Sequence, residues 1–180
     1  MPLPEIYREL VIPVLREVGR LWEADELSVA EEHFVSTTTQ QLLPQLYPFA
    51  DYREPSGKVA LAASIGGNQH DLALRVLADL LELEGWTVVL LGADYPAAEL
   101  PEAVARFGPH LVTLSVALVP QIDTLIEALA AVRAAPDAPK LIVGGRALNG
   151  HPELAERLGA DATSDSVLEV PRIARELLPG

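Results

Sequence analysis

A regular alternation of apolar and amphipathic runs fills residues 58–180 and constrains the fold of this 180-residue chain more than any other feature. Short apolar runs predict strands, and runs with helical periodicity predict helices. Consecutive strand–helix units form a parallel sheet covered on both faces. The number of units favours a flavodoxin-like five-stranded sheet over a six-stranded dinucleotide fold. The expected strands are 58–63, 87–91, 110–116, 140–144 and 161–163, and the expected helices are 70–84, 97–107, 120–134, 152–158 and 167–178.

The first 50 residues carry a purely helical pattern. Residues 4–22 predict a first helix, and Pro13 should kink it or remove one of its hydrogen bonds. Ser28 and Glu31 form a capping box that begins a second helix, which reaches about Leu46. One apolar stripe runs along the first helix: Ile6, Leu10, Val14, Val18 and Trp22. After a linker with prolines and a glycine, the chain should form two parts, a helical pair in 1–50 and an α/β domain in 58–180.

Composition excludes several classes of function. The chain has no cysteine, which rules out disulfides, iron–sulfur clusters and thiol catalysis. Its net charge of −13 repels phosphate backbones, so we expect no direct binding of nucleic acid by this chain. It has no long uncharged apolar run that would cross a membrane. The motifs of nucleotide-binding loops, serine nucleophile elbows and zinc proteases are all absent. The lack of cysteine fits a cytoplasmic protein, and we expect a protein that is not an enzyme.

A candidate site lies where three expected strands end. Gly66-Gly67-Asn68-Gln69-His70 follows the first strand, at the sheet edge where open α/β sheets bind ligands. The imidazole of His70 could reach a metal held above the sheet, although a polar residue at a helix start is the simpler interpretation. Small residues at the other strand ends, Ser115 to Leu118 and Gly144-Gly145, should leave a narrow slot because side-chain bulk is missing there.

These strand ends resemble those of cobalamin-binding domains that hold the corrinoid with its own base displaced. The family pattern is Asp-x-His-x-x-Gly after strand one, Ser-x-Leu after strand three and Gly-Gly after strand four. Asn68 replaces the Asp of that pattern, Ala73 replaces its last Gly, and the leucine stands one residue later. The matching residues here are Asn68, His70 and Ala73, then Ser115, Ala117 and Leu118, then Gly144 and Gly145.

The helical part resembles the cobalamin-dependent photoreceptors, which are light-sensing repressors of carotenoid genes. Trp22, nine further residues and then Glu32-His33 match their Trp-x9-Glu-His signature. The resemblance implies that His70 is the lower axial ligand of cobalt, and that Asn68 fixes the tautomer of its imidazole. It also implies cofactor contacts for Trp22, Glu32 and His33 above the corrin, and for Gly67, Ser115, Ala117, Leu118, Gly144 and Gly145 below it.

The resemblance implies a light-responsive sensor that uses adenosylcobalamin, with methylcobalamin or hydroxocobalamin as alternatives. Glu23 stands where well-known repressors carry a second histidine. Only two helices of the family's four-helix bundle are matched, and the DNA-binding module has no counterpart here, so we expect a homo-oligomer or a regulatory protein partner. Three other readings stay open: the corrinoid carrier of a methyltransferase system, a cobalamin storage or delivery protein, and an α/β domain without a cofactor.

Overall fold

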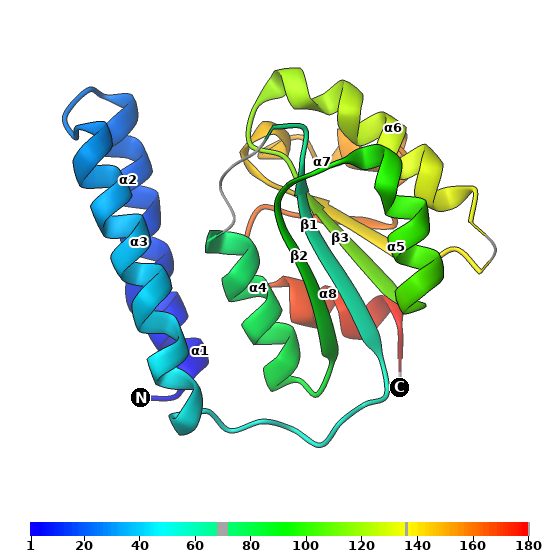
Figure 1. Cartoon of the computed structure of the whole chain (residues 1–180), viewed down its shortest axis with the longest axis horizontal. Coiled ribbons are helices and arrows are strands. Elements are labelled where there is room, and N and C mark those ends of the chain that lie inside the picture. Colours follow the sequence, from blue (N-terminus) through cyan, green and yellow to red (C-terminus); the bar gives the residue numbers. More distant parts are fainter. Residues whose placement is uncertain (68–71, 136, 180) are drawn as a thin grey trace. The chain divides into compact units, whose positions relative to one another are not determined.

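The structure, a computed structural model, describes residues 1–67, 72–135 and 137–179. It divides into two compact units, Met1–Tyr52 and Arg53–Gly180. The first unit is helical and the second is an α/β unit (Figure 1). Among the described residues, no helix is both long enough and apolar enough to cross a membrane.

The first helix of the helical unit contains one turn of π-helix. It runs through α1 (Leu3–Ile6), the π-helical η1 (Tyr7–Val11) and α2 (Ile12–Glu23). The N–H of Ile12 donates to the carbonyl of Tyr7, five residues earlier, instead of four. Pro13 has no N–H for the carbonyl four residues before it, so the helical ladder is interrupted at this point. The disturbance predicted at Pro13 therefore takes the form of a wider turn.

The second helix, α3 (Val29–Leu46), begins at the predicted capping box and is followed by the short η2 (Tyr47–Phe49). The Ser28 hydroxyl accepts a hydrogen bond from the N–H of Glu31 at 3.3 Å. The Glu31 carboxylate in turn accepts from the N–H of Ser28 at 2.9 Å. These reciprocal bonds satisfy two backbone donors that a helix start leaves without partners.

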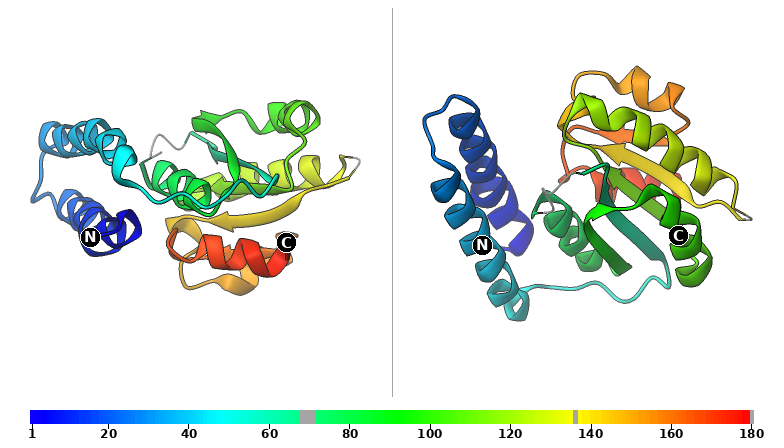
Figure 2. Two further views of the ribbon diagram at one scale, coloured as in Figure 1. Left: turned by 90° about the horizontal axis from the view of Figure 1, so that it is seen from below. Right: turned by 45° about the horizontal axis from the view of Figure 1, so that its top comes forward.

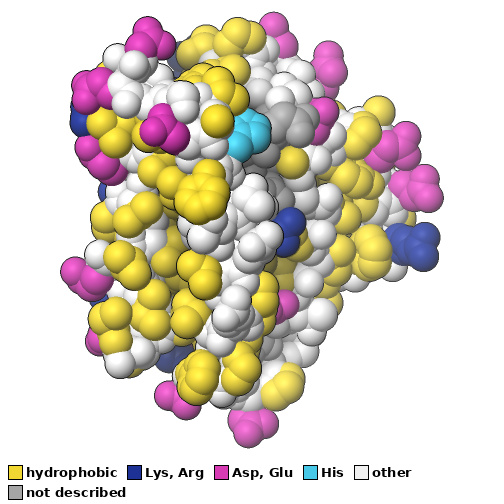
Figure 3. Space-filling model, turned by 60° about the vertical axis from the view of Figure 1, so that its left-hand side comes forward, with side chains coloured by type: hydrophobic (Ala, Val, Ile, Leu, Met, Phe, Trp, Pro, Cys, Tyr) yellow, Lys and Arg dark blue, Asp and Glu magenta, His cyan; other side chains and the backbone are white. Residues whose placement is uncertain are grey.

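Large apolar side chains of the helical unit are exposed. Leu10 is 55% exposed, Trp22 45% and Phe34 71%. Most of the stripe predicted along the first helix therefore faces solvent, and the buried side chains of that helix are Leu3, Tyr7, Val11 and Ile12. Figure 3, turned to bring the helical side forward, shows apolar side chains over much of this surface. Two helices alone do not bury all of their apolar surface.

The α/β unit contains the predicted five-stranded parallel sheet, in the order β2-β1-β3-β4-β5. This is the flavodoxin-like strand order, and the fold prediction is confirmed. Helices cover both faces of the sheet (Figure 2). In chain order the elements are β1 (Val59–Ile65), α4 (Leu72–Leu83), β2 (Thr87–Tyr95), η3 (Ala97–Glu99), α5 (Leu100–Phe107), β3 (Leu111–Ser115), η4 (Val119–Gln121), α6 (Ile122–Arg133), β4 (Lys140–Gly144), η5 (Arg146–Leu148), α7 (Pro152–Arg157), β5 (Ala162–Ser164) and α8 (Val170–Leu177).

Two apolar layers pack against the sheet. On one face, α5 and α6 cover alternate residues such as Leu61, Val112 and Leu141. On the other face, α4 and α8 cover the residues between them, such as Ala62 and Ile142. A strand buried on both faces needs apolar residues throughout, which explains the unbroken apolar runs in the sequence.

Strand β2 is four residues longer than the sequence indicates. Its predicted end was residue 91, but pairing with β1 continues to Tyr95, opposite Ile65. Gly92 has φ +85° and Asp94 φ +48°, and the register between β1 and β2 shifts along this stretch. Glycine and aspartate are poor strand formers, so local propensity ended the predicted strand too early. Bulges let such residues remain in a paired strand.

Asp161 ties together three elements at the amino ends of the strands. Its carboxylate accepts hydrogen bonds from the N–H of Leu141 at 2.8 Å and from the Lys140 ammonium at 3.0 Å, and it pairs with the Arg133 guanidinium. Burial alone would raise the pKa of Asp161, but these hydrogen bonds outweigh burial and lower the pKa below its usual value. The ionised carboxylate therefore joins β5 to β4 and α6.

Asp161→Asn is expected to lower the free energy of unfolding by about 1–3 kcal/mol at pH 7, because charge-assisted hydrogen bonds are lost. A carboxyl whose pKa is lowered by folding contributes stability above its unfolded pKa of about 4, and this stability is lost as the pH falls through its folded pKa. The deficit should thus be constant from pH 7 to about 4 and shrink below that. Urea unfolding across this range tests it. Asp165→Asn, at an exposed position, is the control, and an equal deficit there would contradict the role of Asp161.

Candidate functional site

The strand order creates a crevice at the carboxyl edge of the sheet. The chain passes from β1 to β2 on one side and then to β3 on the other side of β1. Connections that leave a sheet in opposite directions open a gap between neighbouring loops, and ligands of open α/β sheets bind there. The predicted site residues Gly67, Ser115 and Gly144 lie at or just beyond the carboxyl ends of β1, β3 and β4. Of these strands, β1 and β3 flank the point where the connections diverge.

A row of small side chains crosses the sheet at this edge. Ser64 of β1 pairs with Ser115 of β3, Ser115 with Gly144 of β4, and Gly144 with Ser164 of β5. Paired residues project to the same face of a sheet. Two residues earlier on their strands, Ala62, Ile142 and Ala162 belong to the layer covered by α4 and α8. The residues Ser64, Ser115, Gly144 and Ser164, called the serine row below, therefore lie on that same face of the sheet. Ser115 and Gly144 were predicted from the sequence, whereas Ser64 and Ser164 were missed.

The loop after β4 approaches the loop after β3 so closely that only glycine fits. A Cβ on Gly145 would lie 2.1 Å from the carbonyl oxygen of Val116, and Gly145 has φ +104°. A Cβ on Gly144 would lie 2.9 Å from the carbonyl oxygen of Ser164. The Val116 N–H also donates to the Gly144 carbonyl at 3.0 Å. The Gly144-Gly145 pair thus brings two of the predicted motif loops into direct contact.

Gln121, which the sequence analysis missed, holds the loop after β3. Its side-chain oxygen accepts hydrogen bonds from the N–H groups of Ala117 at 2.8 Å and Leu118 at 2.9 Å. Gln121 is only 6% exposed. The predicted site residue Ala117 is half-buried, while Leu118 is 54% exposed. A glutamine six residues after the end of a strand has no distinctive spacing, so the sequence alone carried no signal for it.

The loop after β1 is described as far as Gly67. The N–H of Gly67 donates to the Asp94 carboxylate at 2.7 Å. Asp94 has φ +48°, a conformation that is uncommon outside glycine and that clusters at functional sites. Asn68 and His70, the predicted tautomer-fixing residue and cobalt ligand, lie outside the described residues. Asp94 is a further carboxylate next to this loop, and the sequence analysis missed it because β2 was predicted to end before it.

The predicted upper-face residues lie on the helical unit. Trp22 is in the last turn of α2, and Glu32 and His33 are in the first turns of α3. The Glu32 carboxylate accepts a hydrogen bond from the Ser36 hydroxyl at 2.7 Å and lies 2.7 Å from Nδ1 of His33. The Glu32 side chain is 19% exposed and that of His33 74%. Two neighbours therefore hold the Glu32 carboxylate, while the indole and the imidazole keep accessible surface.

The serine row and the glycine pair fit the nucleotide end of a corrinoid, the cofactor that the sequence resemblance implies. The row has no side chain larger than serine, so it would leave room at this edge of the sheet for a flat aromatic base. The half-buried Ser115 hydroxyl supplies a hydrogen-bonding group. The Ser164 hydroxyl already donates to the carbonyl of Ser166 at 2.8 Å and accepts from its N–H at 3.2 Å. Added side chains at Gly144 or Gly145 would meet backbone atoms at once, so the close approach of these loops depends on the absence of Cβ atoms.

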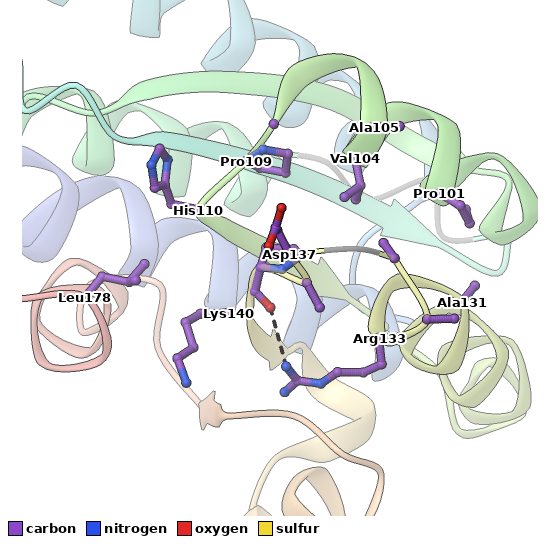
Figure 4. Close-up of a pocket in the computed structure, with 15 residues that line it drawn as sticks. Pro101, Val104, Ala105, Pro109, His110, Ala131, Arg133, Asp137, Lys140 and Leu178 are labelled. Carbon is purple, nitrogen blue, oxygen red and sulfur yellow. Dashed lines mark hydrogen bonds between the residues drawn. The ribbon is translucent and has the colours of Figure 1, made fainter.

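A separate hollow lies at the opposite edge of the sheet. Pro109 and His110 precede β3 there, and Lys140 begins β4, with Arg133 of α6 nearby (Figure 4). His110 accepts a hydrogen bond from the N–H of Val59 at 3.1 Å, and Arg133 donates to the carbonyl of Pro139 at 3.4 Å. These groups hold the amino ends of neighbouring strands together. The hollow contains none of the residues of the cobalamin motifs.

Comparison with known proteins supports the resemblance to cobalamin-binding domains. Residues 58–170 match the family model described as "B12 binding domain", and residues 1–47 match a second model with the same description. The chain is 36% identical over 157 residues to the HTH-type transcriptional repressor CarA of Myxococcus xanthus, and 31% identical over 162 residues to CarH of the same organism. These alignments cover 87% and 88% of this chain, but only 52% of each repressor.

The fold is also that of a solved corrinoid protein. The monomethylamine corrinoid protein of Methanosarcina barkeri superposes with a TM-score of 0.85 at 21% identity. The superposition covers 99% of this chain and 85% of the other. Because the first family model spans residues 58–170, more than half of the chain, and includes all three motif loops, the chain belongs to the family of B12-binding, or cobalamin-binding, domains.

Proposed function

We propose that this chain is a light-responsive sensor that binds adenosylcobalamin with its base displaced and that is not itself an enzyme. The observation that carries the proposal is the trio Trp22, Glu32 and His33 on the helical unit of a chain that also contains the serine row. A cobalamin domain needs only the slot below the corrin. An indole, a held carboxylate and an imidazole at the photoreceptor spacing serve to recognise the ligand above it.

His70 would hold cobalt through one ring nitrogen. A neutral imidazole is a good ligand, and a partner on its other nitrogen fixes the tautomer. Asn68 can accept that hydrogen bond but brings no negative charge. Gly67, Ser115, Ala117, Leu118, Gly144 and Gly145 enclose the displaced nucleotide tail.

Trp22 would pack against the adenosyl group, and Glu32 would accept hydrogen bonds from it. A carboxylate has about four lone-pair sites, so Glu32 keeps accepting capacity beside its bonds to Ser36 and His33. When bound, adenosylcobalamin supplies a cobalt–carbon bond that light breaks. Trp22 and Glu32 would lose their contacts with the adenosyl group when it is absent, and this loss would favour a second packing of the helices.

The response to light would pass to other proteins through direct contacts. The exposed Leu10, Val14 and Phe34 provide apolar surface that suits a further copy of the chain or a regulatory protein. A net charge of −13 disfavours direct contact of this chain with nucleic acid. Because Glu23 stands in place of the second histidine, water or His33 would serve as the upper ligand after illumination.

The test is to load the purified protein with adenosylcobalamin in the dark and then to illuminate it. The absorbance spectrum should change, and the oligomeric state should change with it on size-exclusion chromatography. The same protein loaded with hydroxocobalamin is the control, because it carries no photolabile alkyl group. A spectral change without a change in oligomeric state would contradict the sensor role and leave only cobalamin binding.

The second candidate function is that of a corrinoid carrier for a methyltransferase. Trp22 and His33 are exposed, which is compatible with an upper face open to partner enzymes. A carrier should bind methylcobalamin stably and exchange its methyl group with a methyltransferase. The sensor is favoured because a carrier has no need of a Trp-Glu-His trio that covers the cofactor.

Trp22→Ala is expected to reduce discrimination between adenosylcobalamin and methylcobalamin. The indole contacts only the larger upper ligand, and a large aromatic contact contributes roughly 1.5–3 kcal/mol, or about tenfold to a hundredfold in affinity. Dissociation constants for both forms, measured in the dark, give the ratio. Phe34→Ala, another exposed aromatic of the helical unit, is the matched control. An unchanged ratio for Trp22→Ala would contradict its place above the corrin.

A further inference from the structure

Gln121 links two of the three loops of the site. Its side-chain oxygen accepts from the N–H groups of both Ala117 and Leu118, the two residues after Val116. The backbone N–H of Gln121 donates to the carbonyl of Leu118 at 3.0 Å. Together these bonds close the chain that leaves β3 into one compact turn, whose shape depends on a single buried amide.

The same side chain supports the loop after β1. A Cβ built on Gly66 would lie 3.1 Å from Cβ and 3.3 Å from Cγ of Gln121. Gly66 also has φ +70°, a conformation that suits glycine. The backbone that leads to Gly67 therefore passes directly over the aliphatic part of Gln121, and the two loops that flank the crevice share one support.

The third loop joins this arrangement through Val116. The Val116 carbonyl faces Gly145 closely and accepts a hydrogen bond from the N–H of Ala147 at 3.4 Å. A series of contacts thus runs from Gly66 through Gln121 and the β3 turn to Gly145. A shift of Gln121 would alter the spacing of the loops after β1, β3 and β4 at the same time.

We propose that Gln121 is the positioning residue that sets the width of the slot for the nucleotide tail of cobalamin. It acts through the backbone of Ala117 and Leu118 and through Gly66, without itself having to touch the cofactor. Loss of its carbonyl would leave two N–H groups without their acceptor, and the turn would rearrange to satisfy them. This inference rests on the proposed base-off mode of binding, and not on the response to light.

The experiment compares cobalamin with cobinamide, a corrinoid that lacks the nucleotide tail. Gln121→Met keeps the length of the side chain and removes the strong acceptor. Its affinity for hydroxocobalamin should fall roughly tenfold or more, since both hydrogen bonds are lost, while its affinity for aquocobinamide should stay within about twofold of wild type. Gln121→Glu retains an oxygen for both N–H groups and should bind cobalamin nearly as wild type does.

Glu127→Met, at an exposed position of α6, the helix that follows Gln121, is the control. Equal losses for both corrinoids, or no loss for either, would overturn the role of Gln121 in the slot. So would a Gln121→Glu variant as weak as Gln121→Met. If the wild-type protein binds cobalamin no more tightly than cobinamide, the proposed base-off mode is wrong. That result does not depend on the variants, so it can be told apart from a failure of the role of Gln121. Gln121→Asn, one methylene shorter, gives the same comparison should Gln121→Met not fold.

Discussion

Gly145→Ala is expected to destabilise the α/β unit by about 3 kcal/mol or more, because overpacking and backbone strain act together. The new Cβ would lie 2.1 Å from the carbonyl oxygen of Val116 and 2.8 Å from its backbone carbon and nitrogen. These are backbone atoms, so no side-chain rotation relieves the clash. The residue also has φ +104°, where side chains are rarely found.

Chemical unfolding of the cofactor-free protein measures this loss, and binding of hydroxocobalamin measures its consequence at the slot. Gly150→Ala is the matched control, because Gly150 also has a positive φ, +76°, but an added Cβ would meet nothing within 4 Å. Backbone conformation alone should cost this control about 1–2 kcal/mol. Equal destabilisation of the two variants would show that the approach of Gly145 to Val116 is not as close as described.

His70→Ala is expected to change the visible spectrum of the bound cobalamin to that of a form with water below cobalt. Removing the imidazole removes the lower ligand proposed for the metal, and the affinity should fall roughly tenfold or more. Added free imidazole should restore the spectrum. This prediction depends on the resemblance of Asn68-x-His70 to the cobalamin motif, since both residues lie outside the part of the chain that the structure describes.

His151→Ala provides the comparison, because His151 is an exposed histidine whose Nδ1 lies 3.2 Å from the Glu153 carboxylate. It should bind cobalamin with the wild-type spectrum. Asn68→Asp supplies the carboxylate of the family pattern and should make the imidazole a stronger donor. An identical spectrum in wild type and His70→Ala would remove the histidine from the coordination of cobalt.

The α/β fold could be predicted because its signals are local. Each strand is a short apolar run, and each helix has its own periodicity, so the order of elements follows from neighbouring residues alone. The parallel sheet then follows, since strand–helix–strand units connect in one way. The predictions failed where a long-range pairing overrode local preference, as in β2, which Gly92 and Asp94 do not end because β1 continues to pair with it.

The residues of the candidate site also differ in whether local sequence could predict them. Ser115, Gly144 and Gly145 were predictable because they stand in recognisable motifs at strand ends. Ser64, Ser164 and Gln121 were not, because their importance comes from positions across the sheet and across a loop. Ser64 and Ser164 lie 100 residues apart in the chain and join one row only through the register of four strands.

The sequence by itself determined the elements, their order and the cobalamin motifs, because periodicity and spacing are properties of neighbouring residues. Only the tertiary structure decided which small residues share a face, that the side chain of Gln121 supports two loops, and that Gly145 must lack a side chain. Those facts depend on strand register and on the approach of backbones distant in the chain, and neither can be derived from local sequence.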